Sequence, residues 1–371
     1  MKMTRRKFLD TTASVSAAAL CGCVTSGLAA AKKPGMVWGG LLHLGGNFWD
    51  DAPLPWDQMP TDPEAAAKVQ GPCGKPVRVR NYVRCEEPVW RRLTKTLADE
   101  GSNAVCVDLG EAMVYPSHPE LAVKGSWSFE KVCGEIERLK ALGLTAIPKL
   151  NFSTCHDAWL KDYGRMVSTP EYYRVCRDVI NDVCDAFGEA PYFHLGFDEE
   201  MPIAQFNNSC LICRQDDLWW HDLLAFVAEV EKRGKRAMVW SDYMWTNRRL
   251  FLKRMPKTVL QCNWYYRLDF GEKMLKWNEE FEKKGGWGEC VHGVVAFVEL
   301  EKAGYDQLPC TSNFFRDGVH DPFVAFCKAH IASERLKGFM TAPWALSVAE
   351  EEAKSVRGIR EFGAAKRKYY A

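Results

Sequence analysis

Short runs of apolar and β-branched residues alternate along the chain with longer segments whose apolar residues recur every three or four positions. The short runs predict buried strands, because both faces of a parallel strand are covered in a folded protein. The longer segments predict amphipathic helices. We predict eight strands from this pattern: Met36–Leu42, Asn103–Asp108, Thr145–Leu150, Tyr192–Phe197, Arg236–Trp240, Thr258–Asn263, Gln307–Thr311 and Gly338–Thr341.

The segments between these strands carry the end signals of helices. Thr169 is a good N-cap residue, and Pro170 follows at the first helical position, where its missing N–H leaves no hydrogen bond unmade. The apolar spacing of this helix continues to Gly188, which stops it. Pro88 opens another helix in the same way, and Gly101 ends it.

Strict alternation of strands and helices predicts a parallel sheet covered by helices, and eight such units fit a closed (β/α)₈ TIM barrel, a single α/β domain over residues 32–371. A doubly wound open sheet is the alternative, but no Gly-rich phosphate loop follows the first strand. The one long irregular loop, at 45–87, contains six prolines. We expect it to lie over the top of the barrel as a lid or rim.

Composition bears on which partners and which metal sites are expected. The 371 residues include 49 basic and 48 acidic side chains, and a net charge of +1 gives no reason to expect nucleic acid as a partner. The chain has 14 Trp, 12 Tyr and 19 Phe, whose faces suit sugar rings as well as large cores. Cys210 and Cys213 form the one close cysteine pair beyond the first 31 residues, so zinc is not expected, and a disulfide between them stays open.

The first 31 residues are expected to be an export signal. Arg5 and Arg6 precede an Ala-rich, weakly apolar stretch, which looks like a twin-arginine signal. Serines and threonines dilute this stretch too far for a membrane span, which needs roughly 20 predominantly apolar residues. Cleavage before Cys23, with lipid on that cysteine, and cleavage after Ala31 both remain open. We expect a periplasmic protein, a cell-surface lipoprotein or a secreted protein, with Cys23 as its one membrane contact.

Side chains that suit sugar chemistry gather at the predicted carboxyl ends of the strands, where a barrel of this kind has its active site. Carboxylates can protonate a leaving oxygen, and aromatic faces can stack on a sugar ring. We therefore predict a carbohydrate partner and a catalytic pair, Asp198 and Glu199, after the fourth strand. The predicted ligand-binding residues are Asn151, His156, His194, Trp240, Asp242, Trp264, Tyr265 and Trp344.

Several of these residues also have a structural interpretation. His194 lies within its strand, which favours a buried supporting role. Asp242 could cap the following helix. The three tryptophans, Trp240, Trp264 and Trp344, could equally pack between barrel and helices.

The segment from Tyr192 to Glu200, Tyr-Phe-His-Leu-Gly-Phe-Asp-Glu-Glu, resembles the His-x-Gly-Gly-Asp-Glu signature of glycoside hydrolase family 20, the β-N-acetylhexosaminidases. Phe197 stands where that family usually has its second glycine. The segment from Ile147 to His156 resembles the family's Ile-Pro-Glu-Ile-Asp-x-Pro-Gly-His stretch. The resemblance spans about residues 100–200.

The resemblance implies a retaining, substrate-assisted mechanism, in which the 2-acetamido oxygen of the sugar attacks its own anomeric carbon. Asp198 would hold the acetamido N–H, and Glu199 would protonate the leaving oxygen and later activate water. Neighbours on a strand point to opposite faces, so the chain must bend for both to reach one ligand. Carboxylates this close would also push one pKa upward.

One departure from the family and two alternatives bear on this interpretation. The family usually has an arginine after the first strand, where this chain offers His43 and Asn47. The alternatives are a sugar-binding protein without turnover, and a barrel glycosidase for another sugar in which Glu199 pairs with Asp242 or Glu111. No cofactor is implied, because the sequence has neither a nucleotide-binding loop nor a metal-ligand pattern.

Overall fold

The computed structural model describes residues 35–284 and 292–370. The predicted export signal, with Cys23 and both cleavage sites, lies outside these described residues. The barrel belongs to one compact unit, Gly35–Ala371.

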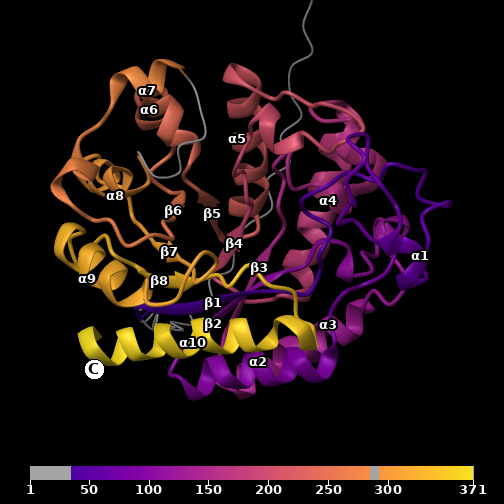
Figure 1. Cartoon of the computed structure of the whole chain (residues 1–371), viewed down its shortest axis with the longest axis horizontal. Helices are drawn as coiled ribbons and strands as arrows, with labels where there is room; N and C mark the ends of the chain where they lie inside the picture. Colours follow the sequence, from indigo (N-terminus) through magenta and orange to yellow (C-terminus); the bar gives the residue numbers. More distant parts are fainter. Residues whose placement is uncertain (1–34, 285–291, 371) are drawn as a thin grey trace, which may run out of the picture. The chain divides into compact units, whose positions relative to one another are not determined.

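Eight parallel strands form the centre of this unit (Figure 1). The sheet order is β6-β5-β4-β3-β2-β1-β8-β7, and isolated parallel bridges between 261 and 307 and between 264 and 310 join its two outer strands. This arrangement confirms the predicted (β/α)₈ barrel. The strands are β1 Val37–His43, β2 Ala104–Asp108, β3 Thr145–Lys149, β4 Tyr192–His194, β5 Arg236–Trp240, β6 Leu260–Cys262, β7 Cys310–Thr311 and β8 Gly338–Thr341.

Helices separate consecutive strands and cover the sheet from outside (Figure 1). The predicted N-cap is present, because the Thr169 side chain accepts a hydrogen bond from the N–H of Tyr172. The α-helices are α1 Pro63–Ala67, α2 Glu87–Asp99, α3 Phe129–Ala141, α4 Pro170–Ala186, α5 Asp216–Lys232, α6 Tyr243–Arg254, α7 Glu279–Lys284, α8 Gly293–Lys302, α9 His320–His330 and α10 Ala349–Tyr370. Short 3₁₀ helices lie at Gly110–Ala112, Pro119–Leu121, Ala158–Arg165, Pro202–Gln205 and Glu272–Leu275.

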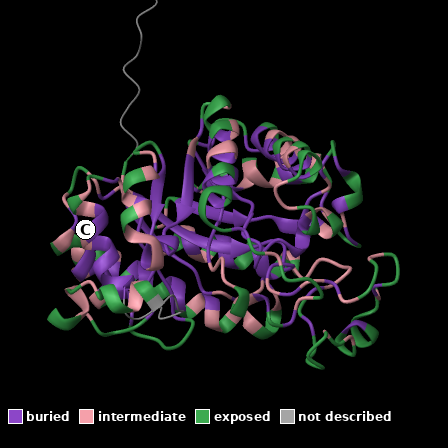
Figure 2. Ribbon diagram, turned by 90° about the horizontal axis from the view of Figure 1, so that it is seen from above, coloured by how far each residue is buried: buried purple, intermediate pink, exposed green. Residues whose placement is uncertain are grey.

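The core lies inside the barrel and between the strands and their helices. Figure 2 shows the strands mostly buried, with exposed residues on the outer faces of the helices; Thr145 and Arg236, the first residues of β3 and β5, are the less buried strand positions. The contact between β8 and β1 depends on glycine at position 338. A Cβ there would lie 2.0 Å from the carbonyl oxygen of Val37, and the residue has φ +151°.

The last helix closes the circle. α10 packs against α9 and α2 (Figure 1). Near its end the ring of Tyr370 lies 5.3 Å from the ring of Trp38 at the start of the first strand. The beginning and the end of the described barrel are therefore in contact.

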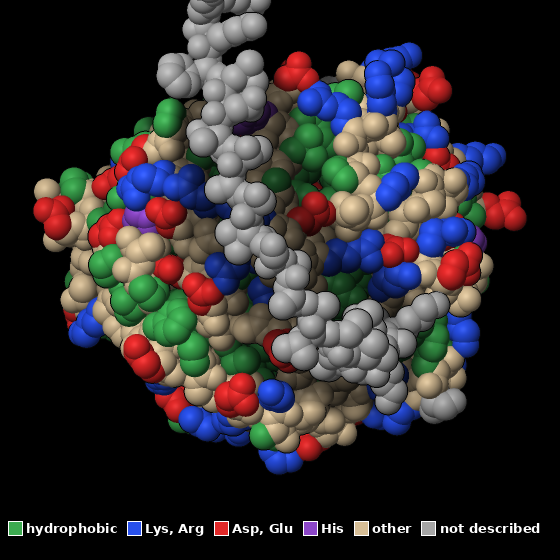
Figure 3. Space-filling view, turned by 180° about the vertical axis from the view of Figure 1, so that it is seen from behind, with side chains coloured by type: hydrophobic (Ala, Val, Ile, Leu, Met, Phe, Trp, Pro, Cys, Tyr) green, Lys and Arg blue, Asp and Glu red, His purple; other side chains and the backbone are tan. Residues whose placement is uncertain are grey.

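The surface carries mixed charge. On the face in Figure 3, basic and acidic side chains are interspersed, as expected for a chain of net charge +1. Within the described residues, no helix combines the length and apolar character that crossing a membrane requires.

Candidate active site

A pocket of about 690 Å³ opens at the carboxyl ends of the strands and contains both residues of the predicted catalytic pair. It draws side chains from the irregular loop after β1, from several strand ends and from the start of α10. Its lining consists of Trp49, Arg78, Arg84, His156, Asp198, Glu199, Trp264, Tyr266, Phe314, Phe315, Trp344, Leu346, Glu351 and Lys354.

The backbone bends sharply after β4. Gly196, Phe197 and Glu199 all have positive φ, at +74°, +69° and +55°. Gly196 could not be another residue, because a Cβ there would lie 1.9 Å from the side-chain oxygen of Asn151. This left-handed stretch replaces the alternation of a strand, so that Asp198 and Glu199 face the same pocket. The bend that the sequence requires for a shared ligand is therefore present.

Asp198 is held by its neighbour on the third strand's end. The Asn151 amide nitrogen donates to Asp198 Oδ1 at 2.8 Å, and the Asn151 oxygen accepts the N–H of Phe197 at 3.3 Å. The hydroxyl of Ser153 donates to the backbone carbonyl of Asp198. Asn151 does not line the pocket but fixes both the carboxylate of Asp198 and the backbone before it.

His156 lies between the two carboxylates. Its Nε2 is 3.5 Å from Asp198 Oδ2 and 3.2 Å from Glu199 Oε2, while its Nδ1 faces the carbonyl oxygen of Phe48 at 3.3 Å. Burial alone would lower the pKa of His156, but attraction to the two carboxylates outweighs it and raises the pKa to about 9. At neutral pH the imidazole is therefore protonated and can donate at both nitrogens.

Asp242 supports the pair from the fifth strand's end. Its Oδ2 accepts the N–H of Glu199 at 2.8 Å, and its Oδ1 faces the indole N–H of Trp264 at 3.4 Å. The side chain makes no capping hydrogen bond to α6. Burial, and then repulsion by Asp198, raise the pKa of Asp242 to about 8. Crowding with Asp198 therefore adds to the effect of burial on the pKa of Asp242.

Aromatic residues form much of the remaining wall. Trp264 and Trp344, two of the residues predicted to bind the ligand, line the pocket, and the ring of Tyr266 stacks on Trp264 at 4.9 Å. Tyr265, the residue predicted from sequence, is not part of this lining; its hydroxyl donates to the carbonyl of Asp269. Consecutive residues after β6 diverge, and Tyr266 is the one that faces the pocket.

Two other predicted ligand-binding residues lie beneath the pocket. His194 is fully buried, and its Nδ1 accepts the N–H of Gly196 at 3.0 Å. Burial, assisted by nearby Lys149, holds the pKa of His194 well below its ordinary value, so the ring is neutral. Trp240 packs on it with ring centroids 4.4 Å apart. Both residues support the bend after β4 and are not part of the pocket lining.

The ends of the first three strands hold a buried ion pair. Lys149 Nζ lies 2.7 Å from Asp108 Oδ2, and His43 Nδ1 lies 3.3 Å from the same oxygen. Burial alone would raise the pKa of Asp108, but Lys149 and His43 lower it. None of the three residues lines the pocket.

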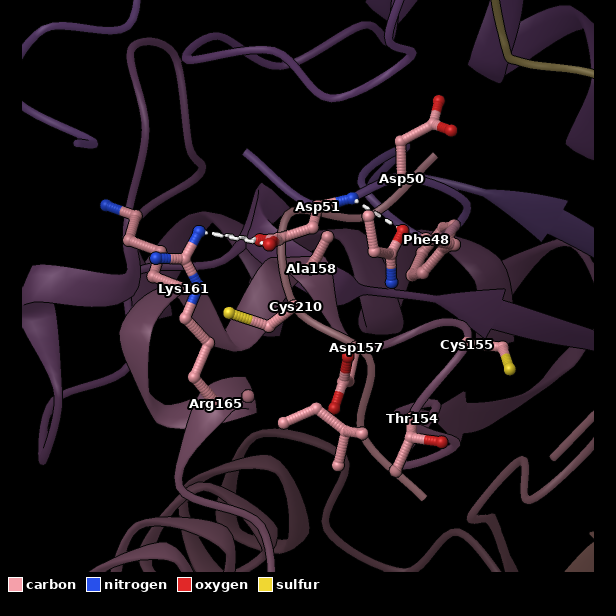
Figure 4. A pocket seen from close by; sticks show the side chains of 13 residues that line it. Phe48, Asp50, Asp51, Thr154, Cys155, Asp157, Ala158, Lys161, Arg165 and Cys210 are labelled. Atoms are coloured by element: carbon pink, nitrogen blue, oxygen red, sulfur yellow. Dashed lines mark hydrogen bonds and ion pairs between the residues drawn. The ribbon is translucent and has the colours of Figure 1, made fainter. Parts of the chain in front are cut away.

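Other cavities near Asp198 and Glu199 differ in their volumes and in the residues that line them. Figure 4 shows a small one beside the loop that carries His156, where Arg165 and Asp51 form an ion pair at 3.0 Å. Its volume of about 20 Å³ is enough for roughly one water molecule and too small for a sugar. A larger pocket of about 700 Å³ is lined by Asp242 and Glu200 but by neither Asp198 nor Glu199.

Sequence reasoning missed eight polar or aromatic residues of the lining. They are Trp49, Arg78, Arg84, Tyr266, Phe314, Phe315, Glu351 and Lys354. The loop at 45–87 supplies the first three, and the expectation that it covers the barrel top was the one available signal for them. In the described part of the chain no cluster of His, Cys, Asp and Glu is arranged to hold a metal ion. Cys210 and Cys213 are free thiols.

The chain matches no protein-family model and no curated protein sequence. Solved structures do match its fold. A mutant β-hexosaminidase of Streptomyces plicatus in complex with its product N-acetylglucosamine gives a TM-score of 0.53 at 14% identity, over 88% of this chain and 63% of the other. A β-N-acetylhexosaminidase from Bacteroides fragilis gives 0.51 at 13%, over 87% and 65%.

A third match is the exo-β-N-acetylglucosaminidase of glycoside hydrolase family 20 from Vibrio harveyi, with a TM-score of 0.51 at 14% identity, over 77% of this chain and 55% of the other. This chain spans less than two thirds of the length of each of the three. At such identities the likeness shows the fold, so the activity must be argued from the site.

Proposed function

We propose that this chain is an exported glycoside hydrolase that cleaves 2-acetamido-sugar glycosides with retention, assisted by the substrate's own acetamido group. The observation that carries the proposal is the pair Asp198 and Glu199, which a left-handed backbone turns into one pocket. The similarity of the fold to β-N-acetylhexosaminidases supports it. The arginine pair and Ala-rich stretch before residue 32 support export.

Asp198 would orient the acetamido group. Asn151 occupies its Oδ1, which leaves Oδ2 to accept the acetamido N–H and to direct the acetamido oxygen at the anomeric carbon. A bond then forms between that oxygen and the anomeric carbon while the glycosidic C–O bond breaks. A negative Asp198 also stabilises the positive charge that develops on the sugar.

Glu199 would move the proton. In the first step its carboxyl gives a proton to the leaving oxygen, and in the second its carboxylate takes a proton from the water that opens the cyclised sugar. His156 donates toward both carboxylates and keeps them in place. Trp264 and Trp344 would pack against the sugar and keep bulk water out.

The alternative partner Glu111 is not supported by its position. Its carboxylate is fully buried and accepts the N–H groups of Gly46 and Asn47, at 2.8 and 3.1 Å. It is not among the pocket-lining residues. Asp242 remains the alternative partner, since its carboxylate accepts the backbone N–H of Glu199.

The test is hydrolysis of aryl glycosides with and without a 2-acetamido group, by the wild type, Glu199→Gln and the control Glu189→Gln, which changes an exposed carboxylate before β4. We expect turnover of the acetamido sugars alone, a loss of about 10²–10⁴-fold in kcat for Glu199→Gln, and none for the control. A thiazoline analogue of the cyclised sugar should inhibit competitively.

Two outcomes contradict the proposal. Equal turnover of sugars that lack the acetamido group would indicate an ordinary two-carboxylate mechanism, with Asp242 as the second group. Saturable binding of acetamido sugars without turnover would make the chain a sugar-binding protein.

A further inference from the structure

We propose that the sugar bound in this pocket carries an anionic substituent, a sulfate ester or a carboxylate, held by Arg78, Arg84 and Lys354. We call these three residues the cationic wall. The inference rests on the proposed function and specifies the substrate class of the same site.

The first observation is that the cationic wall lacks carboxylate partners. Within the described residues, no carboxylate oxygen lies within 4.0 Å of the charged nitrogens of Arg78, Arg84 or Lys354. Most buried or half-buried cations elsewhere in the barrel have such a partner, as Arg214 has in Glu200. Unpaired cations that share a pocket are suited to an anionic ligand.

Aromatic rings of the pocket support two of the three cations. The Arg78 guanidinium lies 5.7 Å from the ring centre of Trp49, and Lys354 Nζ lies 4.4 Å from that of Phe314. An aromatic face attracts a cation without using its N–H groups as a carboxylate would. The donors of Arg78 and Lys354 therefore stay available to a ligand.

Arg84 is the most buried member of the wall. One of its terminal nitrogens donates to the carbonyl of Gly46, but its Nε is buried without an acceptor. Burial lowers its pKa, which attraction to Glu111 partly offsets. A buried N–H without an acceptor is unfavourable, and an oxyanion in the pocket would supply one.

Charge within the pocket is unbalanced in the same direction. His156 lies between Asp198 and Glu199 and compensates the charge of one of these two carboxylates. The cationic wall faces only Glu351 among the other lining carboxylates, and one oxygen of Glu351 accepts the N–H of Leu346 at 2.6 Å. With His156 protonated, the lining has four cations against three carboxylates, an excess of one positive charge, and three of the four cations belong to the cationic wall. A neutral sugar would leave that excess uncompensated.

Guanidinium groups suit both candidate anions. Their planar forks bind a carboxylate or a sulfate through two parallel hydrogen bonds. The geometry of the wall does not discriminate between the two, so the experiment has an arm for each.

The experiment measures binding by calorimetry in a Glu199→Gln background, so that turnover does not interfere. The ligands are N-acetylglucosamine, its 6-sulfate, and a disaccharide of N-acetylglucosamine with a uronic acid. We expect at least one acidic ligand to bind about tenfold or more tightly than the neutral sugar at low salt, with the preference shrinking at about 0.5 M salt. The acidic ligand that gains identifies the anion.

Variants then assign the preference to the wall. Adding Arg84→Gln, Arg78→Gln or Lys354→Gln should reduce the ratio of acidic to neutral affinity by several fold each. Arg360→Gln removes an exposed arginine of α10 outside the pocket lining and should leave the ratio unchanged. Arg78 is exposed, so its variant stays informative even if Arg84→Gln folds poorly.

Equal affinity for acidic and neutral sugars would overturn the inference, as would a preference that survives all three substitutions. Its failure is separable from failure of the proposed function. Efficient cleavage of neutral acetamido glycosides without a preference for acidic ones would support the proposed hydrolase and contradict the anionic substituent. Preferential binding of acidic sugars by a wild type that cleaves none of them does the reverse.

Discussion

Phe197 has a left-handed backbone conformation that glycine adopts without strain. It stands at the position where the family motif that this segment resembles usually has a glycine. Its ring is fully buried, 5.7 Å from the ring of Trp219 and 5.9 Å from that of Phe226. The Arg214 guanidinium lies over the same ring at 4.6 Å. Packing therefore compensates for an unfavourable φ, and the bend survives without the second glycine.

The strain at Phe197 can be separated from its packing. Phe197→Ala and Phe197→Gly both lose the ring, at a cost of about 3–5 kcal/mol. Because left-handed geometry penalises a Cβ, we expect the glycine variant to be more stable than the alanine variant by about 1 kcal/mol. Urea unfolding measures both. Glu350, an exposed position in the first turn of α10, is the control: there the alanine variant should be more stable than the glycine variant. A more stable alanine variant at both positions would contradict the assignment of backbone strain to Phe197.

The charge on His156 predicts how stability depends on pH. The pKa of this group is about 9 in the folded protein and 6.5 in an ordinary setting, so its contribution is complete below about pH 6.5 and is lost as pH rises through about 9. The raised pKa of Asp242, about 8, acts in the same direction, since ionisation leaves a buried anion beside Asp198.

We therefore expect the free energy of unfolding to fall between pH 6 and pH 9.5, by on the order of 3 kcal/mol for the His156 contribution. Urea titrations across this range test it. His156→Gln should flatten the decline, while His221→Gln, at a side chain 64% exposed, should keep it. An unchanged slope in His156→Gln would refute the assignment.

At the scale of elements, the strands that sequence patterns locate best are those without special backbone. β5 and β8 have the predicted bounds. β4 was predicted to reach Phe197 but ends at His194, because the left-handed residues that follow leave the sheet. β7 was predicted to start at Gln307 but covers only Cys310–Thr311, after Pro309, which has no N–H to donate.

The residues of the candidate site also differ in how well the sequence predicts them. Asp198, Glu199 and His156 could be predicted because they follow strands whose carboxyl ends must meet. Arg84 and Lys354 could not, because a long irregular loop and the start of α10 place them, and tertiary packing sets the course of both. No hydrophobic periodicity in the local sequence indicates the course of either segment.

Pairing of β8 with β1 makes a prediction about one glycine. Gly338→Ala would bring a Cβ against the Val37 carbonyl, so we expect a loss of more than about 2 kcal/mol in the free energy of unfolding. Gly304→Ala is the control: φ is +77° there, but no atom lies within 4 Å of the added Cβ, so about 1 kcal/mol should suffice. Equal losses would show that backbone strain, and not contact with β1, sets the cost.

For the whole molecule, the barrel is closed unevenly. β1 pairs with β2 over five successive residues, whereas β6 and β7 are joined through isolated bridges. The seam is held by hydrogen bonds such as those from Leu308 N–H to Gln261 and from Cys310 N–H to Asn263, each at 2.9 Å.

Native-state hydrogen exchange should report this seam. We expect the amides of Leu308 and Cys310 to exchange faster than those of β2, because opening the seam breaks fewer cooperative contacts than opening the β1–β2 pair. Uniform protection around the barrel would contradict this. Substrate analogues that bridge Tyr266 and Trp344 should slow exchange at the seam if they stabilise the closed barrel.

The contact between Trp38 and Tyr370 has a consequence for rearranging the gene. Since the two ends of the described barrel touch, a short flexible linker could connect position 370 to position 35 without crossing the pocket. New ends could then be opened at exposed Gly188, in the turn before β4, on the opposite side of that strand from Asp198. The barrel is in this sense a ring with no obligatory starting strand, and circular permutation is a route to moving its ends away from any chosen fusion partner.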